Sequence, residues 1–399
     1  MSDPSGTFGR LDVVAMFAHD SFVHTRNPAG RFWPSALQER LLRVALEDPE
    51  AAGASWQELR PHFSLDELER GSFELLPMIY RNLTRSGHED PLLPRLKGIY
   101  RKTWVTNNLL VERTRDLGDA LRDAGIRALF IEGVMVARRF YPELGLRPSS
   151  SVDVLVDDRD AAAALDGLAH AGWHERPGSA KGSGVVRHLF DRGGNVCVLR
   201  TRLAIDFVAR NRQGHAHTPL WEAAEWEDIG GLELLVPAPT DTLLAVCVSH
   251  ARAEGAPDVQ WIADAKAVLE AEIDWERLLE IGFESQQGLR LRNAFRYLAN
   301  LPGPSPPRFA LERLTGAKTG GRERLVYLCT AGSIRGAGAM PLLVGEHLAA
   351  TARESSLRTI ATFPGHLGHR WSLSWQRQVP LAAGRRAIRL LTGRRKRAS

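Results

Sequence analysis

The sequence predicts an α+β protein in which a small mixed β-sheet carries packed helices and is flanked by N- and C-terminal helical regions. Two patterns predict this fold. Apolar residues recur at helical spacing in both outer parts of the chain, whereas residues 126–239 contain short β-branched runs that alternate with helical segments. With 399 residues, 44% hydrophobic and 25% charged, the chain is long and apolar enough to bury a full core.

The expected N-terminal helical region covers residues 1–125. Ser35 is the expected N-cap of a first helix, because apolar residues follow it at helical spacing. Ser64 and Glu67 match a capping box and predict a second helix. A long amphipathic helix is expected over residues 96–124, ending at a glycine of the kind that closes helices.

The expected core, residues 126–239, begins with a strand–glycine–helix sequence. Further short strands follow at spacings typical of hairpins, with an alanine-rich helix over residues 159–170 between them. The expected strands are residues 127–131, 151–156, 185–190, 196–199 and 204–208. Residues 240–380 are expected to form a C-terminal helical region, interrupted by a Pro- and Gly-rich linker at residues 301–307.

The charge is unevenly distributed. The formal net charge is +5, and the ten Lys and Arg residues after Glu354 have no acidic residue among them, so residues 1–354 carry −5. Residues 381–399 are therefore a basic tail. Such a tail is able to bind an anionic lipid or nucleic acid through charge alone, or to stay solvated, and the sequence leaves both open.

Cysteine content and hydropathy indicate a cytoplasmic protein. Three scattered cysteines are too few for a disulfide framework or a zinc cluster. The first residues lack a basic segment followed by an apolar one, and no stretch reaches eighteen apolar residues. We therefore expect no secretory signal and no transmembrane segment.

Asp153 and Asp206 each lie inside an apolar strand. Alternation along the first strand places Val152, Val154 and Val156 on one face and Asp153 on the other. A carboxylate in mid-strand is unfavourable unless it is hydrogen-bonded, charge-paired or metal-bound. Two on neighbouring strands would suit magnesium and the phosphates of a nucleotide. Alternatively, each pairs with an arginine or caps a turn, and spacing alone does not decide.

Gly133 stands between the first expected core strand and the helix that follows it. A glycine at this position lets backbone N–H groups approach a phosphate beside the start of a helix. One glycine is a weak indication by itself, because strand-to-helix turns often need one for conformational reasons.

The segment from Phe130 to Val156 resembles a family of bacterial nucleotidyltransferases that are distant relatives of DNA polymerase β. That family has Lys-Gly, then Tyr-Pro, then Arg-Pro-x-x-Asp-x-Asp followed by Leu-Val; here the chain has Glu-Gly, Tyr-Pro and Arg-Pro-Ser-Ser-Ser-Val-Asp-Val-Leu-Val. The similarity extends over roughly residues 35–375, including Trp261 and Asp264, and residues 127–173 are its specific part. It implies a nucleotidyltransferase core for the sheet region.

The resemblance assigns a role to individual residues. Gly133 matches the glycine of the nucleotide-phosphate turn, and Arg147 matches the arginine that would neutralise phosphate or brace the loop. Asp153 matches the second aspartate of Asp-x-Asp and Asp206 the third carboxylate, so both are expected to hold Mg²⁺. Ser151 stands where the family has its first aspartate, so it is expected to lie at the same metal site, beside the bound nucleotide.

The resemblance also has two departures. Ser151 removes one negative charge from the expected two-ion site, and Glu132 replaces a lysine that would help to bind phosphate. Two functions therefore remain open. The first is Mg²⁺-dependent transfer of a nucleoside monophosphate from a nucleoside triphosphate to a hydroxyl of a small molecule, peptide or nucleic acid. The second is a catalytically degenerate protein that binds a nucleotide or a partner. A third function, binding an anionic partner through the tail, is disfavoured by the acidic body.

Overall fold

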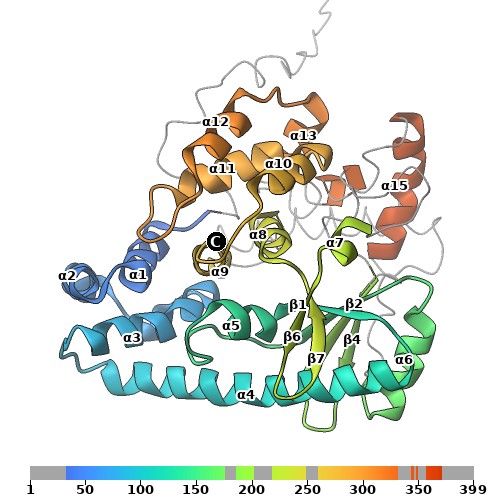
Figure 1. Cartoon of the computed structure of the whole chain (residues 1–399). Helices are drawn as coiled ribbons and strands as arrows, with labels where there is room; N and C mark the ends of the chain where they lie inside the picture. The colour runs from blue at the N-terminus through green and yellow to red at the C-terminus, as the bar shows by residue number, and fades with distance from the viewer. Residues whose placement is uncertain are drawn as a thin grey trace, which may run out of the picture.

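A mixed sheet with a long helix beneath it forms the centre of the molecule, with helices of both chain ends gathered beside and above it (Figure 1). The computed structural model of the chain describes residues 33–175, 186–201, 218–248, 259–330, 343–345, 347–348 and 356–370. The expected strand at residues 204–208, which contains Asp206, and the basic tail at residues 381–399 lie outside the described residues.

The helix expected after Ser35 and the long helix expected over residues 96–124 are both present, the latter as Leu93–Asp123, whereas two helices between them, Pro49–Leu59 and Leu76–Arg85, were not predicted. Ser35 caps the first helix through a capping box, in which its side chain accepts from the Gln38 N–H and the Gln38 side chain accepts from the Ser35 N–H. The prediction of an α-helix beginning at Ser64 is wrong. Only short 3₁₀ turns form there, and the Ser64 side chain makes no cap hydrogen bond. Gly71 follows too soon for the segment to offset the cost of helix nucleation. The elements are α1 (Ala36–Leu46), α2 (Pro49–Leu59), η3 (Arg60–His62), η4 (Leu65–Glu67), η5 (Arg70–Leu75), α3 (Leu76–Arg85) and α4 (Leu93–Asp123).

Within the described residues the sheet has seven strands, in the order β3-β4-β5-β2-β1-β7-β6. The β1–β7 and β2–β5 pairs are parallel and the other neighbours are antiparallel, so the sheet is mixed as predicted. The strands are β1 (Ala128–Gly133), β2 (Val152–Val156), β3 (His174–Glu175), β4 (Val186–Phe190), β5 (Val196–Arg200), β6 (Glu225–Asp228) and β7 (Glu233–Val236). Helices α5 (Val134–Phe140) and α6 (Ala161–His170) separate the first three strands.

Both faces of β2 are buried. Val152, Val154 and Val156 belong to the core between the sheet and α4 and α6, whereas Leu155 packs on the opposite face with Leu129 of β1. The alternation that the sequence predicts is therefore present, and the face that carries Asp153 is covered too.

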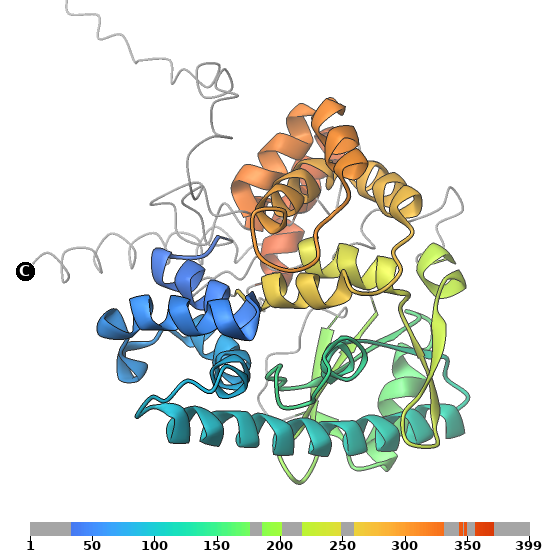
Figure 2. The same cartoon turned by 60° about the vertical axis from the view of Figure 1, so that its left-hand side comes forward.

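The second half of helix α4 supports the sheet and its first half lies beside α3, and both views place the helix along the lower edge of the molecule (Figures 1 and 2). Its buried Leu110, Leu117 and Leu121 join the core that contains the β2 valines. Gly118 permits close approach, because a Cβ there would lie 2.4 Å from Leu234 Cδ2 of β7. The helix and the sheet are thus held in direct contact.

The helices of the two chain ends share one core. Trp56 of α2, Trp261 of α9 and Phe295 of α11 belong to the same cluster of buried residues, and Trp33 meets Trp261 edge to face with ring centroids 6.1 Å apart. The helices after β5 are α7 (Thr218–Glu222), α8 (Pro239–Val248), α9 (Gln260–Val268), α10 (Trp275–Glu284), α11 (Gly288–Leu298), α12 (Arg308–Gly316), α13 (Gly321–Thr330) and α15 (Ser356–Arg370).

No helix within the described ranges is both long enough and apolar enough to cross a bilayer. Helix α4 has the length, with 31 residues, but charged residues occur throughout it. The cysteines Cys197, Cys247 and Cys329 are buried free thiols.

Replacing Asn82 with alanine is expected to lower the free energy of unfolding by about 1–3 kcal/mol, because buried carbonyls would lose their partner. The Asn82 Nδ2 donates to the carbonyls of Val44, Ala45 and Glu47 at 2.9–3.1 Å, at the end of α1. Urea unfolding followed by circular dichroism measures the change. Asn300→Ala is the control, because Asn300 is exposed and makes a single such bond, to Arg296. Equal losses for both variants would contradict the role of Asn82.

Candidate functional site

A glycine turn lies at the end of β1, where the chain enters α5. Gly133 has φ 65° and ψ −128°, a conformation that side chains disfavour. A Cβ at this position would lie 2.3 Å from the Ser151 carbonyl oxygen and 3.0 Å from Asp153 Oδ2. The β1–β2 register shifts between Phe130 and Gly133, so a bulge shapes this end of the strand pair. Only glycine lets the turn approach the Asp153 carboxylate so closely.

Both carboxylate oxygens of Asp153 are occupied by protein donors. Oδ1 accepts from Arg200 Nη2 at 2.9 Å, and Oδ2 accepts from the Ser151 hydroxyl at 2.6 Å. The Asp153 side chain is only 5% exposed. Arg200 ends β5, the parallel neighbour of β2, where it registers with Leu155. The aspartate is thus neutralised by an arginine from the adjacent strand.

Glu132 completes a small charged cluster with Asp153 and Arg200. Its carboxylate lies 3.7 Å from Arg200 Nη2 and its side chain is 34% exposed. Burial, followed by the nearby Asp153 charge, raises the pKa of Glu132, although Arg200 and Arg147 act in the opposite direction. Burial alone would lower the pKa of Arg200, but Glu132 and Asp153 outweigh it and raise that pKa. The guanidinium is therefore held as a cation between two acids.

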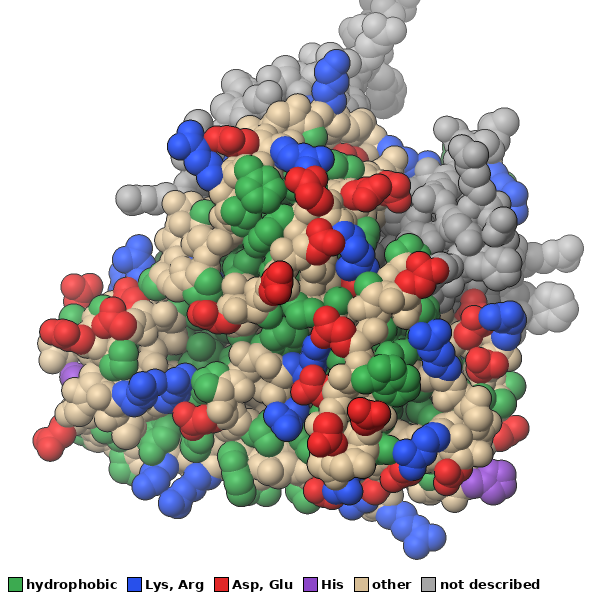
Figure 3. Space-filling view, viewed as in Figure 1, with side chains coloured by type: hydrophobic (Ala, Val, Ile, Leu, Met, Phe, Trp, Pro, Cys, Tyr) green, Lys and Arg blue, Asp and Glu red, His purple; other side chains and the backbone are tan. Residues whose placement is uncertain are grey.

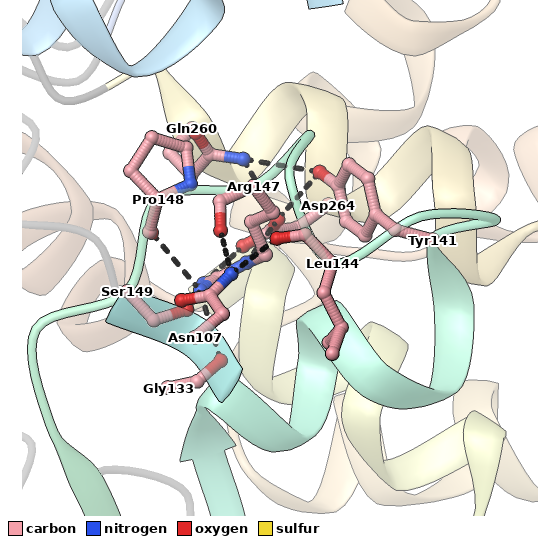
Figure 4. Close-up of polar contacts among 9 residues, drawn as sticks. All are labelled: Asn107, Gly133, Tyr141, Leu144, Arg147, Pro148, Ser149, Gln260 and Asp264. Atoms are coloured by element: carbon pink, nitrogen blue, oxygen red, sulfur yellow. Dashed lines mark hydrogen bonds and ion pairs between the residues drawn. The ribbon is translucent and has the colours of Figure 1, made fainter. Parts of the chain in front are cut away.

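Arg147 is fully engaged within the protein rather than directed at solvent (Figure 4). Its Nε and Nη2 donate to the two carboxylate oxygens of Asp264 in α9 at 2.7 and 2.8 Å, and its Nη1 donates to the Gly133 carbonyl at 2.9 Å. The Arg147 side chain is 12% exposed and that of Asp264 2%. Burial opposes the Arg147 charge, but the ion pair outweighs it and raises the pKa of the guanidinium. This geometry braces the glycine turn.

Further side chains hold the Arg147–Asp264 pair, and sequence reasoning missed them. The Tyr141 hydroxyl and Gln260 Nε2 donate to Asp264 Oδ1 at 2.7 and 3.0 Å. Asn107 Nδ2, from the buried face of α4, donates to the carbonyl of Arg147 at 2.7 Å and to that of Leu144 at 2.6 Å. An amide side chain on the buried face of α4, among leucines and threonines, was the available indication that Asn107 has such a role.

The described residues do not fit a two-ion magnesium site. They contain no group of three or more His, Cys, Asp or Glu side chains able to hold a metal ion. Asp153 has both oxygens engaged, and the charge nearest to it is the Arg200 cation, which would repel a divalent ion. Asp206, the other expected metal ligand, lies in residues 202–217, outside the described part of the chain, so its distance from Asp153 is not defined.

A mixed sheet in which a strand aspartate lies against a strand-to-helix glycine turn agrees with the nucleotidyltransferase-like core that the sequence predicts. The chain belongs to the family described as "uncharacterised nucleotidyltransferase", whose model matches residues 73–302, more than half of its length. The structure also resembles an antigenic nucleotidyltransferase-like protein from Paracoccidioides brasiliensis with a TM-score of 0.33 and 13% identity, over 50% of this chain and 93% of that one. The search of curated proteins gave no match.

Replacing Asp264 with asparagine is expected to lower the free energy of unfolding by about 3–5 kcal/mol, because it leaves the buried Arg147 charge without its partner. Thermal or urea unfolding measures the loss. Asp157→Asn is the matched control: its pair with Arg159 is exposed and should contribute about 0–1 kcal/mol. If the two substitutions cost the same, Arg147 is not held as described.

Proposed function

We propose that this chain is a non-catalytic nucleotide-binding member of the nucleotidyltransferase family, in which Arg200 supplies at Asp153 the positive charge that a metal ion supplies in an active relative. The observation that carries the proposal is the double engagement of the Asp153 carboxylate, by Arg200 at 2.9 Å and by Ser151 at 2.6 Å. An arginine fixed on a strand neutralises charge but does not activate an attacking hydroxyl as a bound metal ion does.

The charge balance supports the loss of transfer activity. In a two-ion mechanism, bridging carboxylates hold the cations that align the attacking hydroxyl with the α-phosphate. Here the position of the first aspartate is Ser151, a neutral residue whose hydroxyl is already donated to Asp153. Loss of one bridging carboxylate is expected to lower the rate of transfer by several orders of magnitude. Each 1.36 kcal/mol added to the activation free energy lowers the rate about tenfold.

Nucleotide binding is supported by the family and by the remaining donors of Arg200. The described contacts of its guanidinium with Asp153 and Glu132 all use Nη2. The side chain is 28% exposed, so N–H groups remain for phosphate oxygens, which arginine binds with well-matched geometry. Arg147 does not contribute in this way, because its donors are used by Asp264, Gly133 and Ser149.

A second candidate function is Mg²⁺-dependent nucleotidyl transfer from a nucleoside triphosphate to a hydroxyl of a small molecule, peptide or nucleic acid. It is favoured by the close approach of the Gly133 turn to Asp153, where a Cβ would lie 3.0 Å from Oδ2. An active relative needs this juxtaposition of phosphate turn and metal ligand. The two functions differ in their need for metal and in the release of pyrophosphate.

Restoring the missing carboxylate and removing the arginine is expected to create a metal site. The variant Ser151→Asp/Arg200→Gln should bind Mn²⁺, because two carboxylates then face each other without a cation between them. Binding is measured by electron paramagnetic resonance and as an Mn²⁺-dependent rise in the melting temperature. The wild type should show neither effect. Ser150→Asp/Arg187→Gln is the control: it makes the same changes at an exposed neighbour and on β4. Tight Mn²⁺ binding by the wild type would contradict the proposal.

The wild type is expected to bind nucleoside triphosphate without magnesium and to release no pyrophosphate. In EDTA, at least one of ATP, GTP, CTP and UTP should raise the melting temperature, and Arg200→Gln should lose most of that rise while Arg187→Gln keeps it. Pyrophosphate release is measured with each triphosphate, Mg²⁺ and a pool of hydroxyl acceptors. Release by the wild type that Asp153→Ala abolishes would establish the transferase instead. Absence of any nucleotide-induced shift would exclude nucleotide binding.

A further inference from the structure

The first half of α4 carries an unusual concentration of positive charge. Between Leu93 and Val111 it has Arg95, Lys97, Arg101 and Lys102 and no acidic residue. In its second half, by contrast, arginines alternate with acids and pair with them three residues apart, as in Arg122–Asp119. In Figure 3 the left part of the lower edge, where α4 begins, shows blue and green side chains, and the right part mixes red and blue.

Most of these cations have no partner within the described part of the chain. Lys97, Arg101 and Lys102 are exposed and form no ion pair with a described residue. Arg95 alone is paired, with Asp66 of η4 at 2.8 Å. Unpaired positive charge on a rigid helix is available to a partner of opposite charge.

Large apolar side chains are exposed on the same part of α4. Trp104, Val105 and Leu109 are 49%, 50% and 51% exposed. Together with Phe73, beside the start of α4, they make up four of the eight large hydrophobic side chains that are exposed among the described residues. Such clustering distinguishes an interaction surface from hydrophobic residues that are scattered singly.

A groove lies where η4 and η5 meet α4, and the exposed side chains extend it. The groove has a volume of about 540 Å³ and is lined by Leu65, Asp66, Phe73, Arg95, Gly98, Ile99 and Lys102. Gly98, Lys102, Val105 and Leu109 follow one another at intervals of four, three and four residues, so they line one side of α4. Groove and stripe therefore form a continuous track of about three helical turns.

We propose that this track, together with Lys97, Arg101 and Trp104 on the adjacent side of α4, docks an acidic amphipathic helix of a partner protein. The partner's apolar side chains would occupy the groove and contact Val105 and Leu109, and its carboxylates would face the unpaired cations. Helices recognised in this way present anchors at i, i+4 and i+7, which matches the track. The surface is separate from the Asp153 cluster and does not depend on nucleotide binding.

A helix fits this surface better than a polyanion does. The groove is concave, and Leu65, Phe73 and Ile99 give it an apolar lining that apolar side chains of a helix fill better than phosphate groups do. Val105 and Leu109 continue the apolar lining along one side of α4 at helical spacing, which suits the apolar face of a helix.

The test is selection of binders to the full-length chain from a random display library of peptides about 16 residues long, or roughly four helical turns. Selected peptides should be rich in Asp and Glu with apolar residues at i, i+4 and i+7. Fluorescence anisotropy of a selected peptide should show affinity lowered more than about tenfold by Val105→Glu/Leu109→Glu and by Lys97→Glu/Arg101→Glu. Trp104→Ala should weaken binding too, whereas Trp226→Ala, which removes an exposed tryptophan of β6, should not.

All variants change exposed residues, and coincident melting curves establish that they fold. The proposal is overturned if the selected peptides lack the acidic amphipathic pattern, if no peptide is selected, or if the α4 variants bind as well as the wild type. It is also overturned if vesicles of phosphatidylglycerol and phosphatidylcholine, or oligothymidylate, bind instead and lose binding only with the charge-reversal variant.

Discussion

The buried ion pair between Arg147 and Asp264 connects the parts of the molecule on which the site depends. One guanidinium joins α9 of the C-terminal helices to the carbonyl of Gly133. Desolvating two charges is expensive, and here the cost is offset by bidentate geometry and by hydrogen bonds from Tyr141 and Gln260. The glycine turn consequently has a fixed position relative to both the sheet and the helices above it.

A second arginine, Arg200, provides the counter-charge of another buried carboxylate, that of Asp153. Asp153 needs a counter-charge because it lies inside a sheet that is buried on both faces. Arg200 supplies this counter-charge from the adjacent strand, 2.9 Å from Asp153 Oδ1. The negative charge inside the sheet is thus balanced by a side chain of the protein itself.

Local patterns allowed much of the fold to be predicted, and contacts between distant segments account for the rest. The cap at Ser35, the mixed sheet and the alternation around Asp153 follow from neighbours in the sequence. The proposed pairing of Asp153 with an arginine was one of two open alternatives, but nothing local identifies Arg200, which is 47 residues away. Asp264 is 117 residues from Arg147. Only the folded topology brings such residues together.

The core shared by the two chain ends has a consequence for synthesis of the protein. Trp33 packs against Trp261 of α9 and Tyr297 of α11, which leave the ribosome more than two hundred residues later. Until then the Trp33 ring lacks these native partners, so this part of the core closes only late in translation. A truncated product restricted to residues 73–302 would likewise lack α1, α2 and α12 and leave an uncovered apolar surface prone to aggregation.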